Sequence, residues 1–413
     1  MLTFLKTNAR WIAGGFLLTM FSSFGQTFFI GLSGEELRTK FDLTDGEFGL
    51  IYMMATLGSA LTLPWLGSLL DRMPGWKVAR FVIPLLACAC LSIAYAPSVI
   101  LLVLAIYALR LFGQGMMTHT ALTEIGRWYS ANRGRATSLV VPGHQAGEAI
   151  LPVTFTIIAL SLGWQMAWTL GAAVLILFAL PAIILLWRVE RVPSGAEAEQ
   201  VDPHTARDWT RGEMIRDPWL YAVLVGVVAP PFIGTTIFFH QDYFIELRGY
   251  DPLVFASAFP LMAGTTIVFA LLAGRLIDTF GALKLLPFFL LPLGVASLAA
   301  GLLTPVWGIY VFMVLVGVSY GFTSTLVGAL WPEMYGVKSL GSIRAMIMSA
   351  MVFSTALGPG LTGLLIDNGV GLPTQLLFMS GWCVLACLIM VRASGAIIRR
   401  NAAAKIDASG GTS

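Results

Sequence analysis

The sequence predicts an all-α integral membrane protein with twelve transmembrane helices in two pseudo-symmetric six-helix bundles. Its 413 residues are 57% hydrophobic and only 11% charged, with a mean hydropathy of +0.82. A soluble core of ordinary surface charge cannot bury so many apolar side chains, so lipid must serve as solvent. A pattern also occurs twice, because Gly67-Ser-Leu-Leu-Asp71 returns 207 residues later as Gly274-Arg-Leu-Ile-Asp278. A duplicated membrane unit explains this repeat.

Apolar runs long enough to cross a hydrocarbon layer of about 30 Å occur twelve times along the chain. The first six cover residues 9–31, 46–66, 80–97, 98–123, 136–160 and 164–187. The second six cover residues 218–240, 253–273, 284–303, 306–330, 342–365 and 374–392. The first run lacks a cleavage site and is predicted to remain as an uncleaved span. The predicted domains are an N-terminal bundle (1–187), a cytoplasmic inter-bundle linker (188–217), a C-terminal bundle (218–392) and a disordered cytoplasmic tail (393–413).

Lysine and arginine fall almost entirely on one side of these spans. If the N-terminus is cytoplasmic, only Arg38, Lys40 and Arg248 lie outside, and Arg110 lies within a span. This asymmetry predicts a multi-pass protein of the cell (inner) membrane with both termini in the cytoplasm. The net charge of +3 then follows from topology, so the expected partners are the lipid bilayer and small molecules, and no nucleic acid. A monomer is expected. The four cysteines lie in apolar spans without metal or disulfide spacing, so neither a metal nor a cofactor is expected.

Ionisable residues within the spans are few and lie mainly in the first six. Arg110 in span 4 and Glu148 in span 5 are expected at similar mid-membrane depth, and His144 precedes Glu148 by one helical turn. An unpaired charge at the bilayer centre costs at least about 2.5 to 3.5 kcal/mol, so such residues pair or face a water-filled pathway. Two interpretations remain open. Either Arg110 holds a substrate carboxylate while Glu148 and His144 exchange a proton, or Arg110 and Glu148 form a permanent structural ion pair.

Several motifs together resemble the major facilitator superfamily. They are the doubled Gly-x-x-x-Asp loop, Arg110-Leu-Phe-Gly-Gln-Gly in span 4, Arg133-Gly-Arg-Ala after it, and Trp331-Pro-Glu-Met-Tyr-Gly after span 10. The resemblance covers nearly the whole chain and implies transport by alternating access. The segments Trp209-Thr-Arg-Gly-Glu-Met and Phe238-Phe-His240-Gln also resemble bacterial monocarboxylate-transporter-like members.

The resemblance implies a conformational latch at the cytoplasmic end of each half. Its residues here are Gly67, Asp71, Arg72, Glu124 and Arg135 in the first half, and Gly274, Asp278, Glu333 and Arg344 in the second. The glycines are expected to allow close helix approach, and each aspartate to meet an arginine or the positive end of a helix. Thr279 stands where a counterpart of Arg72 would be, so an unequal latch is expected. The alternative is that these loop charges serve only topology.

Further polar residues are candidates for the transport pathway. Span 1 lies beside the cavity in the superfamily that the chain resembles, so Gln26 is expected to bind substrate, as is Gln114 in span 4. His240, Asp242 and Glu246 form an outer cluster at the end of span 7. This cluster is either functional or an exposed external rim.

The sequence therefore predicts a secondary active transporter that moves a small organic anion, a monocarboxylate, together with protons. One alternative is an efflux or uptake carrier for a neutral or amphipathic small molecule, in which Arg110 stays paired with Glu148. An alternative of another class is a non-transporting membrane sensor. The sequence carries no Ser/His/Asp cluster, metal-spaced ligand set or nucleotide-binding motif, so an enzyme and an ATP-driven pump are both disfavoured.

Overall fold

The computed structural model describes residues 2–129, 133–189, 191, 209–336 and 339–410. Within these ranges the chain contains helices and their connections, without strands. Eleven of its helices are long and apolar enough to cross a membrane, and a bent pair near the N-terminus makes a twelfth span. The predicted fold class is therefore confirmed for the part of the chain that is described.

The chain packs into two compact units. Unit 1 comprises Met1–Glu199, Ile237–Ala263 and Pro359–Asn368, and unit 2 comprises Gln200–Thr236, Gly264–Gly358 and Gly369–Ser413. This division differs from the predicted halves, because two segments of the second half belong to unit 1. Polar contacts described below tie those segments to the first half. Three helices, α14, α17 and α21, run from one unit into the other.

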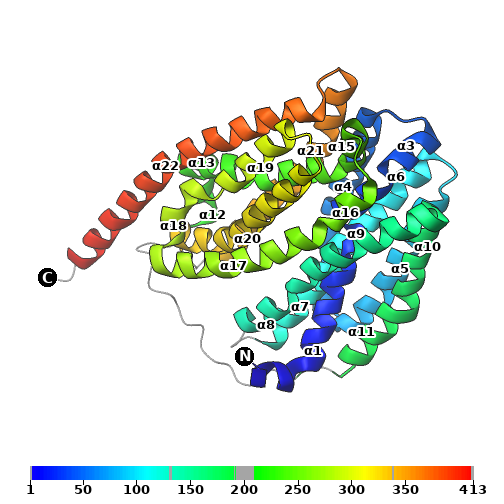
Figure 1. Cartoon of the computed structure of the whole chain (residues 1–413). Helices are drawn as coiled ribbons and strands as arrows, with labels where there is room; N and C mark the ends of the chain where they lie inside the picture. Colours follow the sequence, from blue (N-terminus) through cyan, green and yellow to red (C-terminus); the bar gives the residue numbers. More distant parts are fainter. Residues whose placement is uncertain (1, 130–132, 190, 192–208, 337–338, 411–413) are drawn as a thin grey trace. The chain divides into compact units, whose positions relative to one another are not determined.

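Unit 1 contains the helices of the first half of the sequence and two short helices, α15 and α16, of the second half. They are α1 (Leu2–Phe21), α2 (Thr27–Ile30), α3 (Gly34–Phe41), α4 (Asp45–Gly67), α5 (Gly75–Tyr95), α6 (Val99–Ala108), α7 (Thr118–Trp128), α8 (Arg133–Val140), α9 (Pro142–Leu162), α10 (Trp164–Val174), α11 (Leu180–Trp187), α15 (Gln241–Arg248) and α16 (Pro252–Ser257). Figure 1 shows α1 running beside α7 and α9, which it contacts.

The remaining helices begin with α12, which lies within the predicted linker (188–217). They are α12 (Arg211–Ile215), α13 (Pro218–Val227), α14 (Ala229–Phe239), α17 (Phe259–Phe280), α18 (Ala282–Leu285), α19 (Leu291–Leu302), α20 (Trp307–Tyr335), α21 (Leu340–Asp367) and α22 (Leu372–Gly410). In unit 2, α22 packs along α13 and α19 (Figure 1). Of the predicted linker, residues 190 and 192–208 lie outside the described residues.

The predicted disordered tail from 393 is wrong for residues 393–410. These residues continue α22, which runs to Gly410 without a break. Alanine, arginine and isoleucine dominate the first part of this extension, and alanine and arginine are strong helix formers, so the membrane-spanning helix extends beyond its apolar segment. Residues 411–413 lie outside the described part of the chain.

Span 1 is broken, although the sequence predicted one continuous helix over 9–31. After α1, residues Ser22–Gly25 form a 3-10 turn and Gln26 is extended, with φ −80° and ψ 152°. The helical segments on either side meet at 47°. Span 4 departs from α-helical geometry where it meets this break, because Leu109–Met117 is π-helical. A Cβ on Gly113 would lie 2.7 Å from the Gly25 Cα, so the two backbones touch where both helices are irregular.

Candidate functional site

The π-helical segment of span 4 carries Arg110, which is only 3% exposed. Its Nη1 donates to the Gly25 carbonyl at 3.1 Å and to Thr27 Oγ1 at 3.4 Å. Its guanidinium carbon lies 5.3 Å from the centre of the Tyr52 ring, and its Nε has no hydrogen-bond partner. The described partners of Arg110 are therefore neutral, and its charge is stabilised by backbone and hydroxyl dipoles and an aromatic face.

The break in span 1 explains how this site forms. Span 1 leaves helical geometry at Gln26, which turns polar backbone into the protein interior, where only a buried partner can satisfy it. The Gly25 carbonyl finds that partner in Arg110. Short π-helical segments are frequent at functional sites, and here one places Arg110 against the break.

Two residues of the site escaped the sequence analysis. The hydroxyls of Tyr52 and Thr27 are 2.6 Å apart, and Tyr52 is fully buried. Together they form one wall beside the guanidinium of Arg110. Neither residue carries a charge, so neither differed in the sequence from ordinary polar residues of an apolar span. The position of Thr27 next to Gln26 was the only available signal.

Glu148 and His144 lie on α9, which packs directly on α1. Nδ1 of His144 lies 3.3 Å from Ser22 Oγ, at the start of the break in span 1. Oε2 of Glu148 is buried without a hydrogen-bond partner. The described contacts include no ion pair between Arg110 and Glu148, which argues against the interpretation of a permanent structural pair.

Gln26 and Gln114 both lie near Arg110, but no described hydrogen bond links their side chains to it. Gln26 occupies the break itself, and Gln114 lies in the same π-helical segment as Arg110. A Cβ on Gly25 would lie 2.6 Å from the backbone nitrogen of Gln114. Both glutamine side chains are partly exposed, and among the described contacts no hydrogen bond joins either one to Arg110. Their role in substrate binding stays a prediction.

In the first half, the predicted latch is centred on Glu124 rather than on Asp71. Glu124 is 1% exposed and forms an ion pair with Arg127 at 3.1 Å. Its Cγ would lie 2.5 Å from a Cβ on Gly75, the first residue of α5. Three other predicted latch residues of this half are exposed: Asp71, Arg72 and Arg135.

In the second half, the corresponding Glu333 contacts backbone nitrogens. Oε2 of Glu333 accepts from the backbone nitrogens of Ala282 at 2.7 Å and Leu283 at 3.3 Å, at the N-terminus of α18. The carboxylate of Glu333 therefore meets the positive end of a helix. Such a contact was predicted for Asp278, which is instead exposed. Arg344 donates to the Gly328 carbonyl at 2.7 Å. The latch function of these residues stays a prediction.

The two motif glycines differ in their surroundings. A Cβ on Gly67 would lie 2.9 Å from Nε2 of His119, whereas a Cβ on Gly274 would meet nothing within 4 Å. The predicted close helix approach thus holds for Gly67, and it is wrong for Gly274 in this conformation.

This difference leads to a testable result. Gly67→Ala is expected to destabilise the protein by about 1 kcal/mol, because His119 must move to admit the methyl group. Gly274→Ala is expected to be neutral or slightly stabilising, because alanine favours a helix over glycine. Thermal unfolding of the detergent-solubilised variants measures both effects. Adding His119→Ala to Gly67→Ala should recover the lost stability, and equal melting of the two single variants would contradict the assigned contact.

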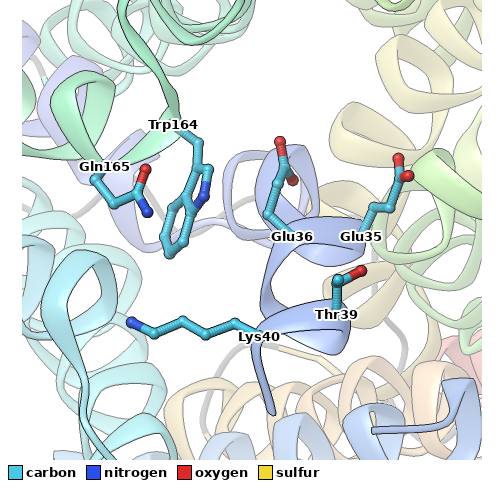
Figure 2. Close-up of a pocket in the computed structure, with 6 residues that line it drawn as sticks. All are labelled: Glu35, Glu36, Thr39, Lys40, Trp164 and Gln165. Carbon is cyan, nitrogen blue, oxygen red and sulfur yellow. The ribbon is translucent and has the colours of Figure 1, made fainter. Parts of the chain in front are cut away.

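A pocket of about 440 Å³ opens beside α3, separate from the Arg110 site. It is lined by Glu35, Glu36, Thr39, Lys40, Trp164 and Gln165 (Figure 2). Lys40 Nζ lies 5.6 Å from the centre of the Trp164 ring, so the pocket already contains a cation against its aromatic wall. None of the residues around Arg110 or Glu148 lines this pocket.

The fold and the site together define a class of protein. Broken and π-helical spans around a buried charge are typical of a membrane transporter, in which irregular backbone lines a substrate pathway. Comparison with known families agrees, because a model described as "Major Facilitator Superfamily" matches residues 15–342 and 248–406. The chain belongs to the major facilitator superfamily, and its family and fold are those of membrane transporters rather than enzymes.

Three similar solved structures have this fold. A bacterial homologue of the human lysosomal transporter Spinster, inward-facing and unoccupied, is 15% identical with a TM-score of 0.66, covering 97% of this chain and 96% of that chain. A POT family transporter in complex with 5-aminolevulinic acid is 13% identical with a TM-score of 0.68, covering 94% and 96%. A mutant of the nucleoside transporter NupG is 12% identical with a TM-score of 0.71, covering 93% and 99%. These identities establish the fold alone, and no curated protein matches the chain.

Proposed function

We propose that this protein is a proton-coupled secondary transporter that moves a small organic anion, a monocarboxylate, across the cytoplasmic membrane by alternating access. The observation that carries this proposal is the burial of Arg110 among neutral partners. A buried charge without a partner of opposite sign is costly unless a ligand or water reaches it. A carboxylate substrate would supply that missing charge.

The unused donor of Arg110 supports a carboxylate in particular. A carboxylate binds a guanidinium through two parallel hydrogen bonds, and Nε of Arg110 has no partner in the structure. One guanidinium balances one carboxylate, so a monoanion fits better than a dianion. The aromatic rings of Tyr52 and Phe239, whose centres are 4.5 Å apart, offer apolar contact to the rest of a small substrate.

Proton coupling is assigned to Glu148, with His144 as its neighbour. No donor holds Oε2 of Glu148, so the carboxyl group is free to take up and release a proton as the spans around it rearrange. His144 lies one helical turn away on the same face of α9, beside Ser22 in the broken part of span 1. When a substrate carboxylate arrives at Arg110, the added negative charge would favour a proton on Glu148.

Replacing Glu148 by glutamine is expected to separate exchange from coupling. Glutamine keeps the shape of the side chain but cannot lose a proton, so exchange of labelled monocarboxylate should continue at a rate within about three-fold of the wild type, while stimulation by an inward proton gradient disappears. Uptake into proteoliposomes measures both. Glu246→Gln on α15 is the matched control, because Glu246 is exposed, and it should respond to the gradient as the wild type does. A gradient response retained by Glu148→Gln would overturn the assignment.

The same assay distinguishes the remaining alternatives. If no carboxylate is moved by the wild type, while neutral or amphipathic compounds are, the protein is a carrier for those compounds. If it binds small molecules without moving any of them, the sensor alternative is favoured.

A further inference from the structure

Unit 1 contains a second charged cluster, distinct from the Arg110 site, formed by Arg38, Asp45, Asp242 and His240. Arg38 of α3 forms ion pairs with Asp45 of α4 and, at 2.7 Å, with Asp242 of α15. The side chains of these three residues are 12 to 15% exposed, and that of His240 is 3% exposed. From the sequence, this region is either functional or an exposed rim, and the burial of His240 excludes the exposed rim for that residue.

Both ring nitrogens of His240 lie near oxygen atoms of other residues. Nε2 lies 3.0 Å from the carbonyl oxygen of Pro359 in α21, and Nδ1 lies 3.6 Å from Oδ1 of Asp45. A carbonyl and a carboxylate can only accept hydrogen bonds, so both ring nitrogens face acceptors. Only the imidazolium form carries a hydrogen on both nitrogens. In that form the cluster holds two cations and two carboxylates, and its charges balance.

Among the described residues, the charged groups close to His240 are Asp45, Arg38 and Asp242, and Glu36 of α3 interacts electrostatically with both Arg38 and Asp242. Asp45 comes from α4, Arg38 from α3 and Asp242 from α15, whereas α21 contributes the Pro359 carbonyl. Burial raises the pKa of Asp242, while Arg38 and His240 lower it, so both neighbouring groups favour the charged form of Asp242. If His240 loses its proton, the cluster has one excess negative charge in a buried place.

The contacts around the cluster join distant parts of the chain. Oδ2 of Asp367, at the end of α21, accepts from Thr44 Oγ1 at 2.8 Å and from the Gly46 nitrogen at 3.0 Å. The Gln241 side chain donates to the Phe28 carbonyl at 2.7 Å. These bonds and the charged cluster hold α15 and the end of α21, both from the second half of the sequence, against α2, α3 and α4 of the first half.

We propose that Arg38, Asp45, Asp242 and His240 form a proton-operated latch on the outer side of the transporter. A proton on His240 holds α15 and the end of α21 against α3 and α4, and loss of that proton releases them. The latch rests on the proposed function for the membrane orientation and for alternating access, but it does not depend on which substrate is transported. Access from outside is then regulated by external pH, separately from the proton that Glu148 carries.

Hydrogen–deuterium exchange of the purified, full-length protein in nanodiscs tests the latch without any substrate. The measurement compares amide protection in α3 and α15 at about pH 5.5 and about pH 8, on either side of the range where imidazole changes charge, after correction for the intrinsic pH dependence of exchange. In the wild type, protection is expected to fall about 10-fold at the higher pH. In His240→Gln, it should stay at the low level at both values.

Two further variants keep the test decisive. Asp45→Asn removes one carboxylate, so the cluster is balanced without the His240 proton, and the pH response should vanish or reverse. Glu246→Gln, an exposed carboxylate on the same helix as Asp242, should respond as the wild type does. A pH response in His240→Gln equal to that of the wild type, or equal protection at both pH values in the wild type, would overturn the latch. Because no substrate is present, failure of monocarboxylate transport leaves this result intact, and normal proton-coupled uptake would not rescue a failed latch.

Discussion

Replacing Arg110 by glutamine is expected to reduce uptake of the transported anion by at least about 30-fold. Removing one partner of a buried, hydrogen-bonded charge pair costs about 2 to 5 kcal/mol, and each 1.4 kcal/mol is tenfold in affinity. Glutamine can still donate to the Gly25 carbonyl, so the fold around the break in span 1 should survive while the charge is lost. Uptake and direct binding of labelled monocarboxylates measure the effect. Arg110→Lys is expected to recover little, because an ammonium cannot make the two parallel hydrogen bonds that a guanidinium makes.

The control for this prediction is a variant that removes another arginine of the same unit. Arg80 is exposed on α5, so Arg80→Gln should leave uptake unchanged. The melting temperature of Arg110→Gln must also stay near that of the wild type, which separates lost binding from lost fold. If a well-folded Arg110→Gln protein moves monocarboxylates at the wild-type rate, Arg110 is not the anion site.

Substituting alanine for Gly113 is expected to cause a larger loss of stability than Gly67→Ala or Gly274→Ala. Its new Cβ would lie 2.7 Å from both Cα and N of Gly25, and backbone atoms cannot rotate away as a side chain can. Spans 1 and 4 must therefore separate, at a cost of about 1 to 3 kcal/mol. The shift also moves the π-helical segment that carries Arg110, so transport should fall together with the melting temperature.

Gly264→Ala provides the matched comparison for Gly113→Ala. Gly264 lies inside α17, and a Cβ there would meet nothing within 4 Å. This variant should melt at or slightly above the wild-type temperature, because alanine favours the helix. If Gly113→Ala melts as the wild type does, then spans 1 and 4 do not cross as closely as described.

Most of the fold could be predicted because each transmembrane helix is indicated by its own local stretch of apolar sequence. The membrane excludes every backbone arrangement except one with internal hydrogen bonds, so an apolar run of sufficient length is a helix. The break in span 1 is different. It depends on Gly25 meeting Gly113 of another span, and no local feature of Ser22-Ser-Phe-Gly25 distinguishes a 3-10 turn from a continuing helix. The helical extension of α22 was missed because the chain ends in Ala408-Ser-Gly-Gly-Thr-Ser, which is typical of a disordered tail, although the alanines and arginines before it favour a helix.

The candidate site was only partly predictable, because some of its residues come together only when distant spans pack. Charges within spans are rare, so Arg110, Glu148 and His144 could be identified from the sequence. Tyr52 and Thr27 carry no charge and join the site only through folding. The contact with a helix end was assigned to Asp278, whereas Glu333 makes it, because the sequence does not show how a short loop lies against α18. Likewise, the burial of His240 depends on Pro359, more than a hundred residues further along the chain.

The most direct test of the central claim measures proton and substrate movement in the same proteoliposomes. A pH indicator is enclosed in the lumen, a labelled monocarboxylate is added outside without any imposed gradient, and both signals are followed in wild type, Arg110→Gln and Glu148→Gln. The expected result is that the wild-type lumen acidifies as the label enters, that Arg110→Gln shows neither signal, and that Glu148→Gln takes up label only into liposomes preloaded with the unlabelled monocarboxylate, without acidification. Entry of the label in wild type without a change in luminal pH, or acidification that persists in Glu148→Gln, would contradict it.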